Sequence, residues 1–358
     1  MNENLLEVQD LKVYFKVRAG HVHAVDGVTF AVKPGEKVAI VGESGCGKSV
    51  TALSIMRLVA QPPGVYAGGN IFFENEDLLT LSERRMQKIR GGQIGIIFQD
   101  PMSCLNPTMT VGDQIAEGLR IHRKIDKKEA RARATTLLEE VGIPAAKERY
   151  DSYPHQFSGG MRQRVMIAVA LACNPKLLIA DEPTTALDVT VQAQILEQIS
   201  SICKEFGTAL ILITHDLGVV AGLSDRVIVM YAGKVIEEGE TNEIFSNPRH
   251  PYTLGLLNSV PRLNEERQSE LNTIEGAPPD LVKPPTGCPF MARCYFAKKI
   301  CNEMPSFDPV EGQPTHRKAC WVDVTDPNVQ AYAERRRQAR RAAQVEAIDE
   351  AANVLQGE

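Results

Sequence analysis

The sequence predicts an α/β protein with a helical subdomain inserted into its sheet and a small cysteine-rich extension near its C-terminal end. Over residues 1–260, short β-branched runs alternate with helical patterns. A segment at about 100–175 has helical patterns throughout, and from about 261 the composition shifts to proline, glycine and cysteine. We therefore expect a main α/β domain over 1–260, an extension over 261–325 and a polar helical tail over 326–358.

Length, composition and charge are those of a soluble globular protein. The chain has 358 residues, of which 43% are hydrophobic and 24% charged, and this length suits about two domains. A formal net charge of −5 gives no global basic surface, so no nucleic-acid partner is expected. The acidic start "MNENLLEVQD" lacks the features of a signal peptide, and no apolar run is long enough for a membrane span.

Continuous apolar runs predict the strands, and their alternation with helical segments predicts a mostly parallel sheet. The runs are "VAIVG", "IGIIFQ", "KLLIAD", "ALILITHD" and "RVIVMYAGKVIEEG". Apolar residues on both faces indicate strands that are covered on both sides. The segments "VGDQIAEGLR" and "KKEARARATTLLEEVGI" are typical of the helices expected in the insertion.

The stretch "GESGCGKS", residues 42–49, fits the phosphate-binding pattern GxxxxGK[ST]. It follows the predicted strand "VAIV" and opens a helix, so backbone N–H groups and a helix N-terminus converge on anionic oxygens. Lys48 would reach the β and γ oxygens of a nucleotide, and Ser49 would ligate Mg²⁺. A chance glycine-rich turn is the alternative. The candidate nucleotide-binding residues here are Gly42, Ser44, Gly45, Cys46, Gly47, Lys48, Ser49 and Val50.

Two further predicted strands are followed by residues suited to hydrolysis. The strand "LLIAD" ends in Asp181, at the edge where parallel sheets bind ligands, and Asp181 would hold Mg²⁺. Glu182 would act as general base on the attacking water. His215 follows "LILIT" and would contact a γ-phosphate. Each of these residues, taken alone, is more often a loop, helix-start or structural residue.

The stretch "FSGGMRQR", residues 157–164, predicts a second anion site. Ser158 can cap the helix that follows, and Gly159 and Gly160 expose its first N–H groups. This helix end lies about 110 residues after the phosphate loop. The two anion sites therefore need not bind the same nucleotide within one subunit.

Four cysteines gather near the C-terminal end: Cys288, Cys294, Cys301 and Cys320. From the residues alone they would ligate an iron–sulfur cluster, bind structural zinc with His316 as an alternative ligand, or stay reduced and unconnected. The lack of short CxxC pairs weakens the zinc interpretation. A simple redox protein would explain the cysteines and leave the ATPase motifs unexplained.

In their order along the chain these motifs resemble the ATP-binding cassette (ABC) ATPases, a P-loop NTPase family with a mixed sheet that includes an antiparallel β part. "IIFQDP" with Gln99, "TTALD" with Asp188, and an aromatic residue near the start, Phe15 or Tyr14, complete the set. The segments "YPHQFSGGMRQRVMIAVAL" and "NPRHPYTLGLL" and the cysteine region are similar to ATPase subunits of bacterial dipeptide and oligopeptide importers. This resemblance covers residues 5 to about 322.

The resemblance implies a role for each candidate residue. Phe15 stacks on adenine; Glu182, His215 and Gln99 are catalytic; and Ser49, Gln99 and Asp181 are the Mg²⁺ ligands. Ser158, Gly159 and Gly160 contact ATP on the opposing subunit of a head-to-tail dimer. The four cysteines hold a [4Fe-4S] cluster, with Zn²⁺ as the alternative.

The resemblance also implies partners and a location. The partners are a second ABC ATPase subunit, two membrane permeases and an extracytoplasmic binding protein, and the location is the cytoplasmic face of the membrane. The implied function is to power uptake of dipeptides or oligopeptides. Alternatives are the ATPase of an importer for nickel chelates, opines or other solutes, and a soluble ABC ATPase of DNA repair. The resemblance also implies that cargo specificity resides in other subunits.

Overall fold

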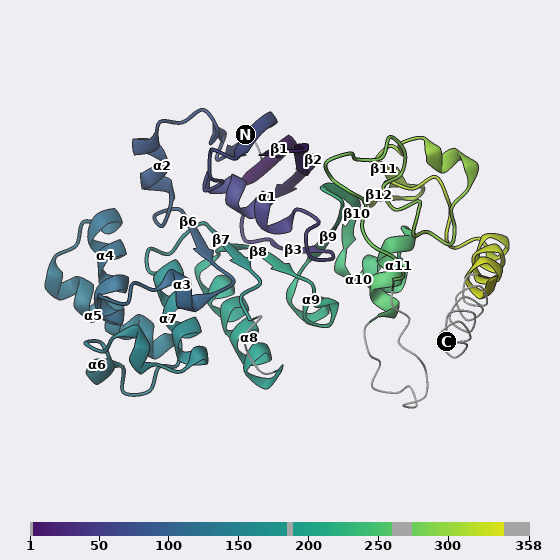
Figure 1. Cartoon of the computed structure of the whole chain (residues 1–358). Coiled ribbons are helices and arrows are strands. Elements are labelled where there is room, and N and C mark those ends of the chain that lie inside the picture. Colours follow the sequence, from purple (N-terminus) through teal and green to yellow (C-terminus); the bar gives the residue numbers. More distant parts are fainter. Residues whose placement is uncertain (1–2, 185–188, 260–273, 340–358) are drawn as a thin grey trace, which may run out of the picture. The chain divides into compact units, whose positions relative to one another are not determined.

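The computed structural model describes residues 3–184, 189–259 and 274–339, and it divides into two compact units, residues 1–235 and 236–358 (Figure 1). Asp188 and residues 340–358 of the expected tail lie outside the described residues. The first unit contains the phosphate loop and the "FSGGMRQR" stretch. The second contains the four clustered cysteines.

A parallel sheet forms the centre of the first unit, in the order β9-β3-β8-β7-β6. Nearly every residue of these strands is buried, which is why their sequences are continuous apolar runs rather than alternating ones. Their bounds are β3 (Lys37–Val41), β6 (Ile94–Ile97), β7 (Leu177–Asp181), β8 (Ala209–Thr214) and β9 (Arg226–Tyr231). Parallel pairing brings the carboxyl ends of these strands to one edge.

A second, antiparallel sheet has the order β2-β1-β4-β5. Its strands are β1 (Leu6–Val17), β2 (Gly20–Val32), β4 (Gly64–Phe73) and β5 (Glu76–Asp77). β1 is central and pairs with β2 and β4, so that Leu6 lies opposite both Val32 and Phe73. The expected mixed α/β fold with an antiparallel part is thereby confirmed.

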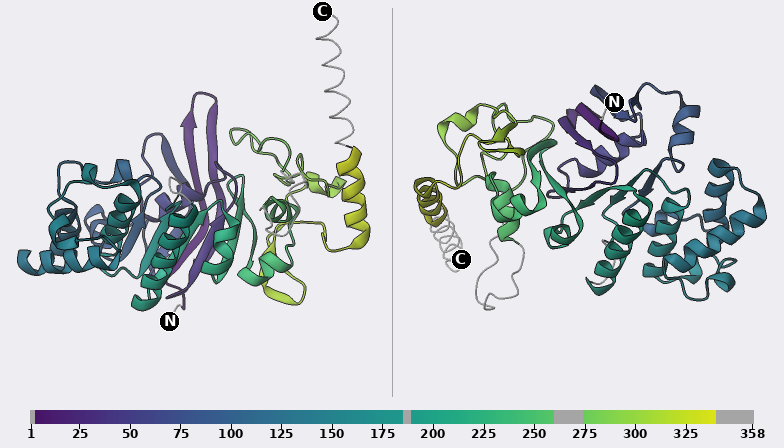
Figure 2. Two further views of the ribbon diagram at one scale, coloured as in Figure 1. Left: turned by 90° about the horizontal axis from the view of Figure 1, so that it is seen from below. Right: turned by 180° about the vertical axis from the view of Figure 1, so that it is seen from behind.

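Helices flank the parallel strands on both faces (Figures 1 and 2). α1 (Lys48–Ile55) lies on one face, and α8 (Val189–Phe206) and α9 (Leu217–Leu223) lie on the other. α2 (Glu83–Ile89) follows the antiparallel strands. Its N-terminus is capped by Ser82, whose side chain accepts a hydrogen bond from the Arg85 N–H.

The segment between β6 and β7 is helical, as its sequence predicts. It contains α3 (Pro101–Cys104), α4 (Val111–Arg123), α5 (Lys127–Glu140), α6 (Ala146–Arg149), a 3₁₀ turn (Pro154–Gln156) and α7 (Gly159–Leu171). α4 buries Val111, Ile115 and Leu119, which recur every four residues and so share one face of the helix. These side chains belong to the same apolar core as those of α5 and α7.

The second unit has little regular structure. Its elements are β10 (Lys234–Glu240), α10 (Thr241–Ser246), α11 (Pro251–Asn258), a 3₁₀ turn (Lys299–Asn302), β11 (Asp308–Val310), β12 (Gln313–Lys318) and a helix at 327–339. β12 pairs antiparallel with both β10 and β11. A small core contains Cys301, Val322 and Val329, with Cys288 and Cys320 packed against it. The cysteines therefore supply much of the apolar packing in this part of the chain.

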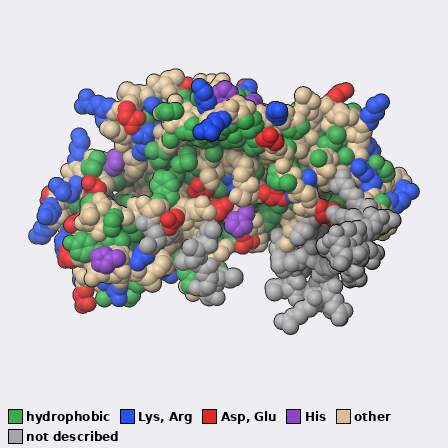
Figure 3. Space-filling model, in the orientation of Figure 1, with side chains coloured by type: hydrophobic (Ala, Val, Ile, Leu, Met, Phe, Trp, Pro, Cys, Tyr) green, Lys and Arg blue, Asp and Glu red, His purple; other side chains and the backbone are tan. Residues whose placement is uncertain are grey.

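Within the parts of the chain that the structure describes, none of the helices has the length and apolar character required to cross a bilayer. On the face shown in Figure 3, acidic and basic side chains are interspersed rather than gathered into fields of one sign.

Candidate functional site

A cavity of about 490 Å³ lies in the first unit, next to the carboxyl ends of the parallel strands. It brings together side chains from the phosphate loop, from the segment after β6, and from the ends of β7 and β8. Its lining consists of Ala24, Ser44, Gly45, Gly47, Lys48, Ser49, Val50, Gln99, Glu182 and His215. All of these except Ala24 were candidates from the sequence.

The phosphate loop requires glycine where the chain approaches other backbone. Gly47 has φ of 104°, and a Cβ atom there would lie 2.4 Å from the Ala24 carbonyl oxygen. Gly42 is similarly restricted, because a Cβ would lie 2.3 Å from the Met230 carbonyl oxygen. These contacts leave no room for a side chain at either position. Glycine therefore allows the loop to pass close to the neighbouring backbone and to present its N–H groups to phosphate.

Lys48 follows this loop and is only 4% exposed. Its ammonium group donates hydrogen bonds to the carbonyl oxygens of Gly42, at 2.8 Å, and Glu43, at 2.9 Å. A buried cation that lines this cavity suits the negative charge of a nucleotide. Cys46 is also buried, and it does not line the cavity.

Ser49 and Asp181 form the oxygen pair expected of a Mg²⁺ site. The Ser49 hydroxyl donates a 2.9 Å hydrogen bond to Asp181 Oδ1. Burial raises the pKa of the Asp181 carboxyl above its ordinary value, because the charged form loses its hydration. Hydroxyl and carboxylate oxygens are ligands that Mg²⁺ prefers, so this donor set fits the ion.

Glu182 is held by groups from three separate segments. Its backbone φ is 45°, and its N–H donates to the Ile213 carbonyl oxygen at 2.9 Å. Gln99 Nε2 donates to Glu182 Oε2 at 3.0 Å, and His215 Nδ1 lies 3.5 Å from Oε1. A non-glycine residue in the left-handed region is uncommon. This conformation and these contacts aim the carboxylate into the cavity.

The "SGG" residues are not part of this cavity within the single chain. Ser158 is exposed and caps α7, with its Oγ accepting a hydrogen bond from the Met161 N–H at 3.4 Å. Gly159 is also exposed, and a Cβ there would meet nothing within 4 Å. The start of α7 is therefore an open helix N-terminus, as the sequence suggested.

The aromatic candidates for adenine stacking also lie outside the cavity lining. Phe15 is partly buried on β1, with its ring 3.4 Å from the position of a Cβ on Gly64. Tyr14 stacks on His23 at 4.0 Å and donates its hydroxyl to Asp26 Oδ1 at 2.8 Å. Ala24 lines the cavity, but no sequence motif marked it as a site residue. It lies there because strand β2 passes next to the phosphate loop in the folded chain.

The second unit gathers all four clustered cysteines around one small cavity of about 10 Å³. It is lined by His250, Pro251, Cys288, Phe290, Met291, Cys294, Cys301, Pro305, Cys320, Trp321 and Val322. The four sulfurs lie close enough for the charge of each to influence the others. All four are free thiols.

Backbone N–H groups point at every one of these sulfurs. Lys298 N donates to Cys301 Sγ at 3.5 Å and Val322 N to Cys320 Sγ at 3.4 Å. Cys288 Sγ accepts from the N–H groups of Phe290 and Met291, and Cys294 Sγ from that of Phe296. Burial nevertheless raises the pKa of the thiols of Cys288, Cys294 and Cys320, that of Cys320 to about 11.

No group of three or more His, Cys, Asp or Glu side chains within the described ranges is arranged to hold a metal ion. His316 does not line the cysteine cavity. It is fully buried against Glu237, with 2.7 Å between His316 Nε2 and Glu237 Oε1. Glu237 also accepts hydrogen bonds from the backbone N–H groups of Arg249 and His250.

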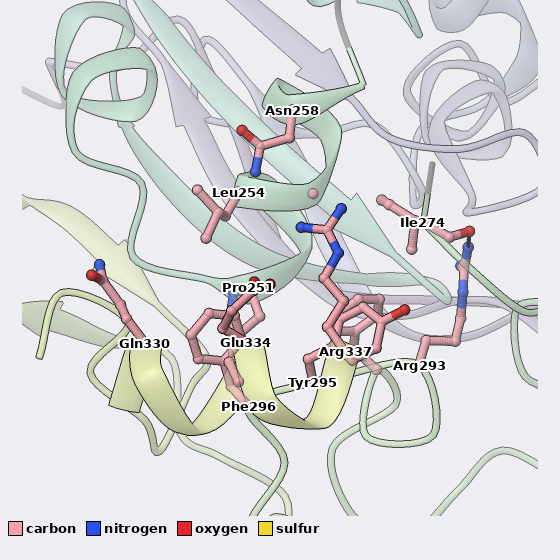
Figure 4. Close-up of a pocket in the computed structure, with 13 residues that line it drawn as sticks. Pro251, Leu254, Asn258, Ile274, Arg293, Tyr295, Phe296, Gln330, Glu334 and Arg337 are labelled. Atoms are coloured by element: carbon pink, nitrogen blue, oxygen red, sulfur yellow. Dashed lines mark hydrogen bonds between the residues drawn. The ribbon is translucent and has the colours of Figure 1, made fainter. Parts of the chain in front are cut away.

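A larger cavity of about 230 Å³ in the same unit lies between α11 and the helix at 327–339 (Figure 4). It shares Pro251 and Phe290 with the cysteine cavity. Its buried Arg293 donates to the carbonyl oxygens of Ile274 and Glu275, both at 3.0 Å. Arg293 therefore anchors the backbone that leads into the cysteine region.

Known protein families match both the phosphate-loop part and the C-terminal part of the chain. Residues 25–185 match the family model "ABC transporter", and residues 236–301 match "Oligopeptide/dipeptide transporter, C-terminal region". The chain is 56% identical to the oligopeptide transport ATP-binding protein OppD of Bacillus subtilis, over 89% of this chain and 88% of that protein. It is 54% identical to the dipeptide transport ATP-binding protein DppD of the same organism, over 89% and 95%.

Among solved structures, the chain resembles the dimeric, post-hydrolysis state of the ATP-binding cassette MJ0796 bound to ADP and Pi. The identity is 29% and the TM-score 0.60, over 66% of this chain and 98% of that one. The cavity, the ordered motifs and these similarities lead to one assignment. The chain belongs to the ABC transporter ATPases that carry the oligopeptide/dipeptide transporter C-terminal region.

Proposed function

We propose that this chain is the ATP-hydrolysing subunit of a membrane importer for dipeptides or oligopeptides. The observation that carries the proposal is the presence, in one chain, of a cavity lined by the phosphate loop and of the transporter-type C-terminal region. The relatives that are more than half identical are named for oligopeptide and dipeptide transport. We assign the nucleotide-binding domain to residues 1–260 and the extension to 261–325.

Different cavity residues have different roles in ATP hydrolysis. N–H groups of the loop from Gly42 to Gly47 and the Lys48 ammonium bind the phosphates. Ser49, Asp181 and Gln99 would hold Mg²⁺, which would supply charge neutralisation on the phosphate oxygens. The remaining cavity groups act on the water and the γ-phosphate.

Glu182 accepts the proton of the attacking water as general base. Its fixed backbone and its contacts with Gln99 and His215 aim Oε1 and Oε2 before the nucleotide arrives, which reduces the reorganisation that the reaction requires. His215 is well exposed, with 60% of its side chain accessible. It is therefore free to turn toward the γ-phosphate.

A second ATPase subunit completes each site in this proposal. Ser158, Gly159 and Gly160 form an open helix N-terminus outside the chain's own cavity, which suits the phosphates of a nucleotide on an opposing subunit. Phe15, or its β1 neighbour Tyr14, would contact the adenine. The cassette of the similar solved structure is itself dimeric. Two permeases, a binding protein and a position on the cytoplasmic face of the membrane complete the proposed assembly.

The four cysteines are proposed to hold a [4Fe-4S] cluster. The proposal is supported by the convergence on one cavity of four thiols, two buried and two partly buried, each with a backbone N–H donor. Zn²⁺ on the same thiolates is the alternative. The cluster would fix a segment with little regular structure.

Transport by the assembled complex tests the function. The chain is co-expressed with two permeases, a second ATPase and a binding protein of a peptide importer and reconstituted into vesicles. We expect ATP-dependent uptake of labelled dipeptide that stops with Glu182→Gln. Uptake of a nickel chelate or opine without dipeptide uptake would replace the peptide assignment. ATPase activity that responds to DNA and not to the permeases would replace the transporter assignment.

A further inference from the structure

The cavity of about 230 Å³ in the second unit is separate from the nucleotide chemistry, because none of its described lining residues belongs to the phosphate motifs. Its walls are α11, the chain at Ile274, the loop at 290–296 and the helix at 327–339 (Figure 4). The volume equals that of about eight water molecules at ~30 Å³ each. A concave site of this size suits a small molecule and is too small to enclose a long peptide.

Most of this lining is apolar. Phe290 and Ala333 are buried, whereas the chain itself covers Leu254, Ile274 and Phe296 only in part. Apolar surface is stabilised when it is removed from water. These side chains therefore favour a ligand that carries an apolar group.

Charged side chains of both signs line the same cavity. Glu334 and Arg337 are three residues apart on the helix at 327–339, and residues at this spacing share one face of a helix. In Figure 4 both side chains extend from this helix toward α11. Each charge of a ligand in an apolar cavity needs a partner of opposite sign. A carboxylate and a guanidinium in one lining therefore complement a molecule that carries both an ammonium and a carboxylate group.

The wall at Ile274 is held by two contacts. Arg293 Nη2 donates to the Ile274 carbonyl oxygen at 3.0 Å. The Ile274 side chain packs closely on α11, since a Cβ atom on Gly255 would lie 2.9 Å from Ile274 Cγ1. This wall therefore keeps its position whether or not a ligand is bound.

The helix at 327–339 is also fixed. Arg336 donates to the Ala297 carbonyl oxygen at 2.9 Å, next to the loop that forms another wall. Val329 is 7% exposed and belongs to the small core of the second unit. Both sides of the cavity are thus preformed, which lowers the entropic cost of binding a ligand.

We propose that this cavity binds a small zwitterion with an apolar side chain, either an amino acid or a dipeptide. Arg337 pairs with the carboxylate of the ligand, and Glu334 accepts hydrogen bonds from its ammonium group. The apolar side chain of the ligand lies against Leu254 and Ile274. The inference rests on the lining of this cavity and does not rest on the proposed function. A ligand that contacts both α11 and the helix at 327–339 also stabilises the second unit.

The test measures binding of leucine and of the dipeptide alanyl-leucine to the full chain without nucleotide, by ligand-detected NMR titration. The C-terminal amide and the N-acetyl form of each compound are titrated in parallel. We expect the amide and the N-acetyl form to bind about tenfold more weakly than the zwitterion, the scale of losing one charged hydrogen bond. A preference for leucine or for alanyl-leucine decides which of the two is the ligand.

Variants assign each ligand charge to its partner. Arg337→Gln should weaken binding of the zwitterion about tenfold and leave binding of the amide unchanged, because the amide has no carboxylate to lose. Glu334→Gln should likewise weaken the zwitterion and leave the N-acetyl form unchanged. Arg335→Gln is the matched control. It removes an exposed charge from the same helix, outside the cavity lining, and should bind as wild type.

Leu254→Trp tests the location of the site, because the larger side chain fills the cavity. This variant should bind neither compound, and its thermal unfolding shows whether the second unit remains folded. Persistent binding would place the ligand elsewhere and overturn the proposal.

Two further results would contradict the inference. Wild-type protein that binds neither leucine nor alanyl-leucine at millimolar concentration has no such site. Equal losses for zwitterion and amide in Arg337→Gln would show that Arg337 supports the cavity wall and does not contact a carboxylate. Because nucleotide is left out, neither result bears on the ATP cavity.

Discussion

Gln99 and Glu182 are joined side chain to side chain, with Gln99 Nε2 donating to Glu182 Oε2 at 3.0 Å. The two residues follow neighbouring parallel strands, β6 and β7, so their contact depends on the pairing of those strands. Gln99 also precedes the helical segment that ends in α7. A movement of this helical segment can therefore change the orientation of the Glu182 carboxylate. The contact offers a physical link between association of the two ATPase subunits and hydrolysis.

Glu182→Gln should bind MgATP and hydrolyse it at least ~10²-fold more slowly, the scale of losing a general base. Glutamine keeps the size of the side chain and an oxygen that can accept from Gln99, but it cannot take a proton from water. Steady-state phosphate release by the assembled transporter, with a nucleotide-binding assay, measures both effects. Glu205→Gln, on the exposed surface of α8, is the control and should behave as wild type. Near-normal turnover of Glu182→Gln would remove this residue from the role.

Asp181→Asn should stabilise the protein free of nucleotide and Mg²⁺ at neutral pH while abolishing efficient hydrolysis. Burial raises the pKa of Asp181 above its ordinary value of 3.8, so the folded state binds the proton more tightly than the unfolded state. The stability linked to this proton is complete below the ordinary pKa and is lost as pH rises through the raised pKa. Asparagine does not suffer this loss.

Thermal unfolding of Asp181→Asn and wild type at pH 5 and pH 8, without Mg²⁺, tests this sign. The advantage of asparagine should be larger at pH 8, with each 1 kcal/mol appearing as about 2–4 °C for a unit of this size. Asp216→Asn, which preserves the cap of α9, serves as control. An equal advantage at both pH values would contradict the burial effect.

Gly47→Ala should destabilise the first unit more than Gly45→Ala. Both glycines have positive φ, 104° and 80°, which costs alanine about 1–2 kcal/mol. At Gly47 the added Cβ also meets the Ala24 carbonyl oxygen at 2.4 Å, whereas at Gly45 it meets nothing within 4 Å. Overpacking adds about 1–3 kcal/mol. Denaturant unfolding of the two variants measures the difference in their free energies of unfolding. Equal losses would show that the Ala24 carbonyl moves away from the added Cβ at little energetic cost.

Ser158→Asn should weaken the ATP-dependent association with the second ATPase subunit while MgATP binding to the separate chain stays unchanged. Asparagine preserves the cap of α7, so the fold of the helix is not the variable. It replaces the small hydroxyl group at an exposed helix start with a larger side chain. Sedimentation of the two subunits with ATP, using a hydrolysis-deficient background, measures the association. Loss of nucleotide binding by the isolated variant would place Ser158 in its own chain's site.

Anaerobically purified protein should be brown and contain about four irons per chain, as a cubane cluster requires. Cys294→Ser should lose most of the iron, while Cys104→Ser, exposed and in the other unit, should keep it. Because the free volume of the cysteine cavity is only about 10 Å³, loading must shift neighbouring side chains. Trp321 borders this cavity, so its fluorescence should change on reconstitution. Stoichiometric zinc without iron would replace the cluster with a zinc site.

The phosphate loop, the cap at Ser158 and the buried parallel strands could all be predicted from the sequence. Each depends on residues within one turn, one strand or one helix end, where backbone geometry and hydrogen bonding are local. The alternation of apolar runs with helices was enough to predict the α/β class. The resemblance to a known family was needed to connect distant motifs such as Gln99 and His215 with one nucleotide.

Contacts between distant segments were decided by the tertiary structure. The Ala24 carbonyl that excludes a side chain at Gly47, and the joint hold of Gln99 and His215 on Glu182, require strands that are far apart in sequence to lie side by side. The pairing of His316 with Glu237 and the position of His250 beside the cysteines arise in the same way. Local sequence restricts the dihedral angles of a segment, whereas the environment of a side chain depends on which surfaces become buried together.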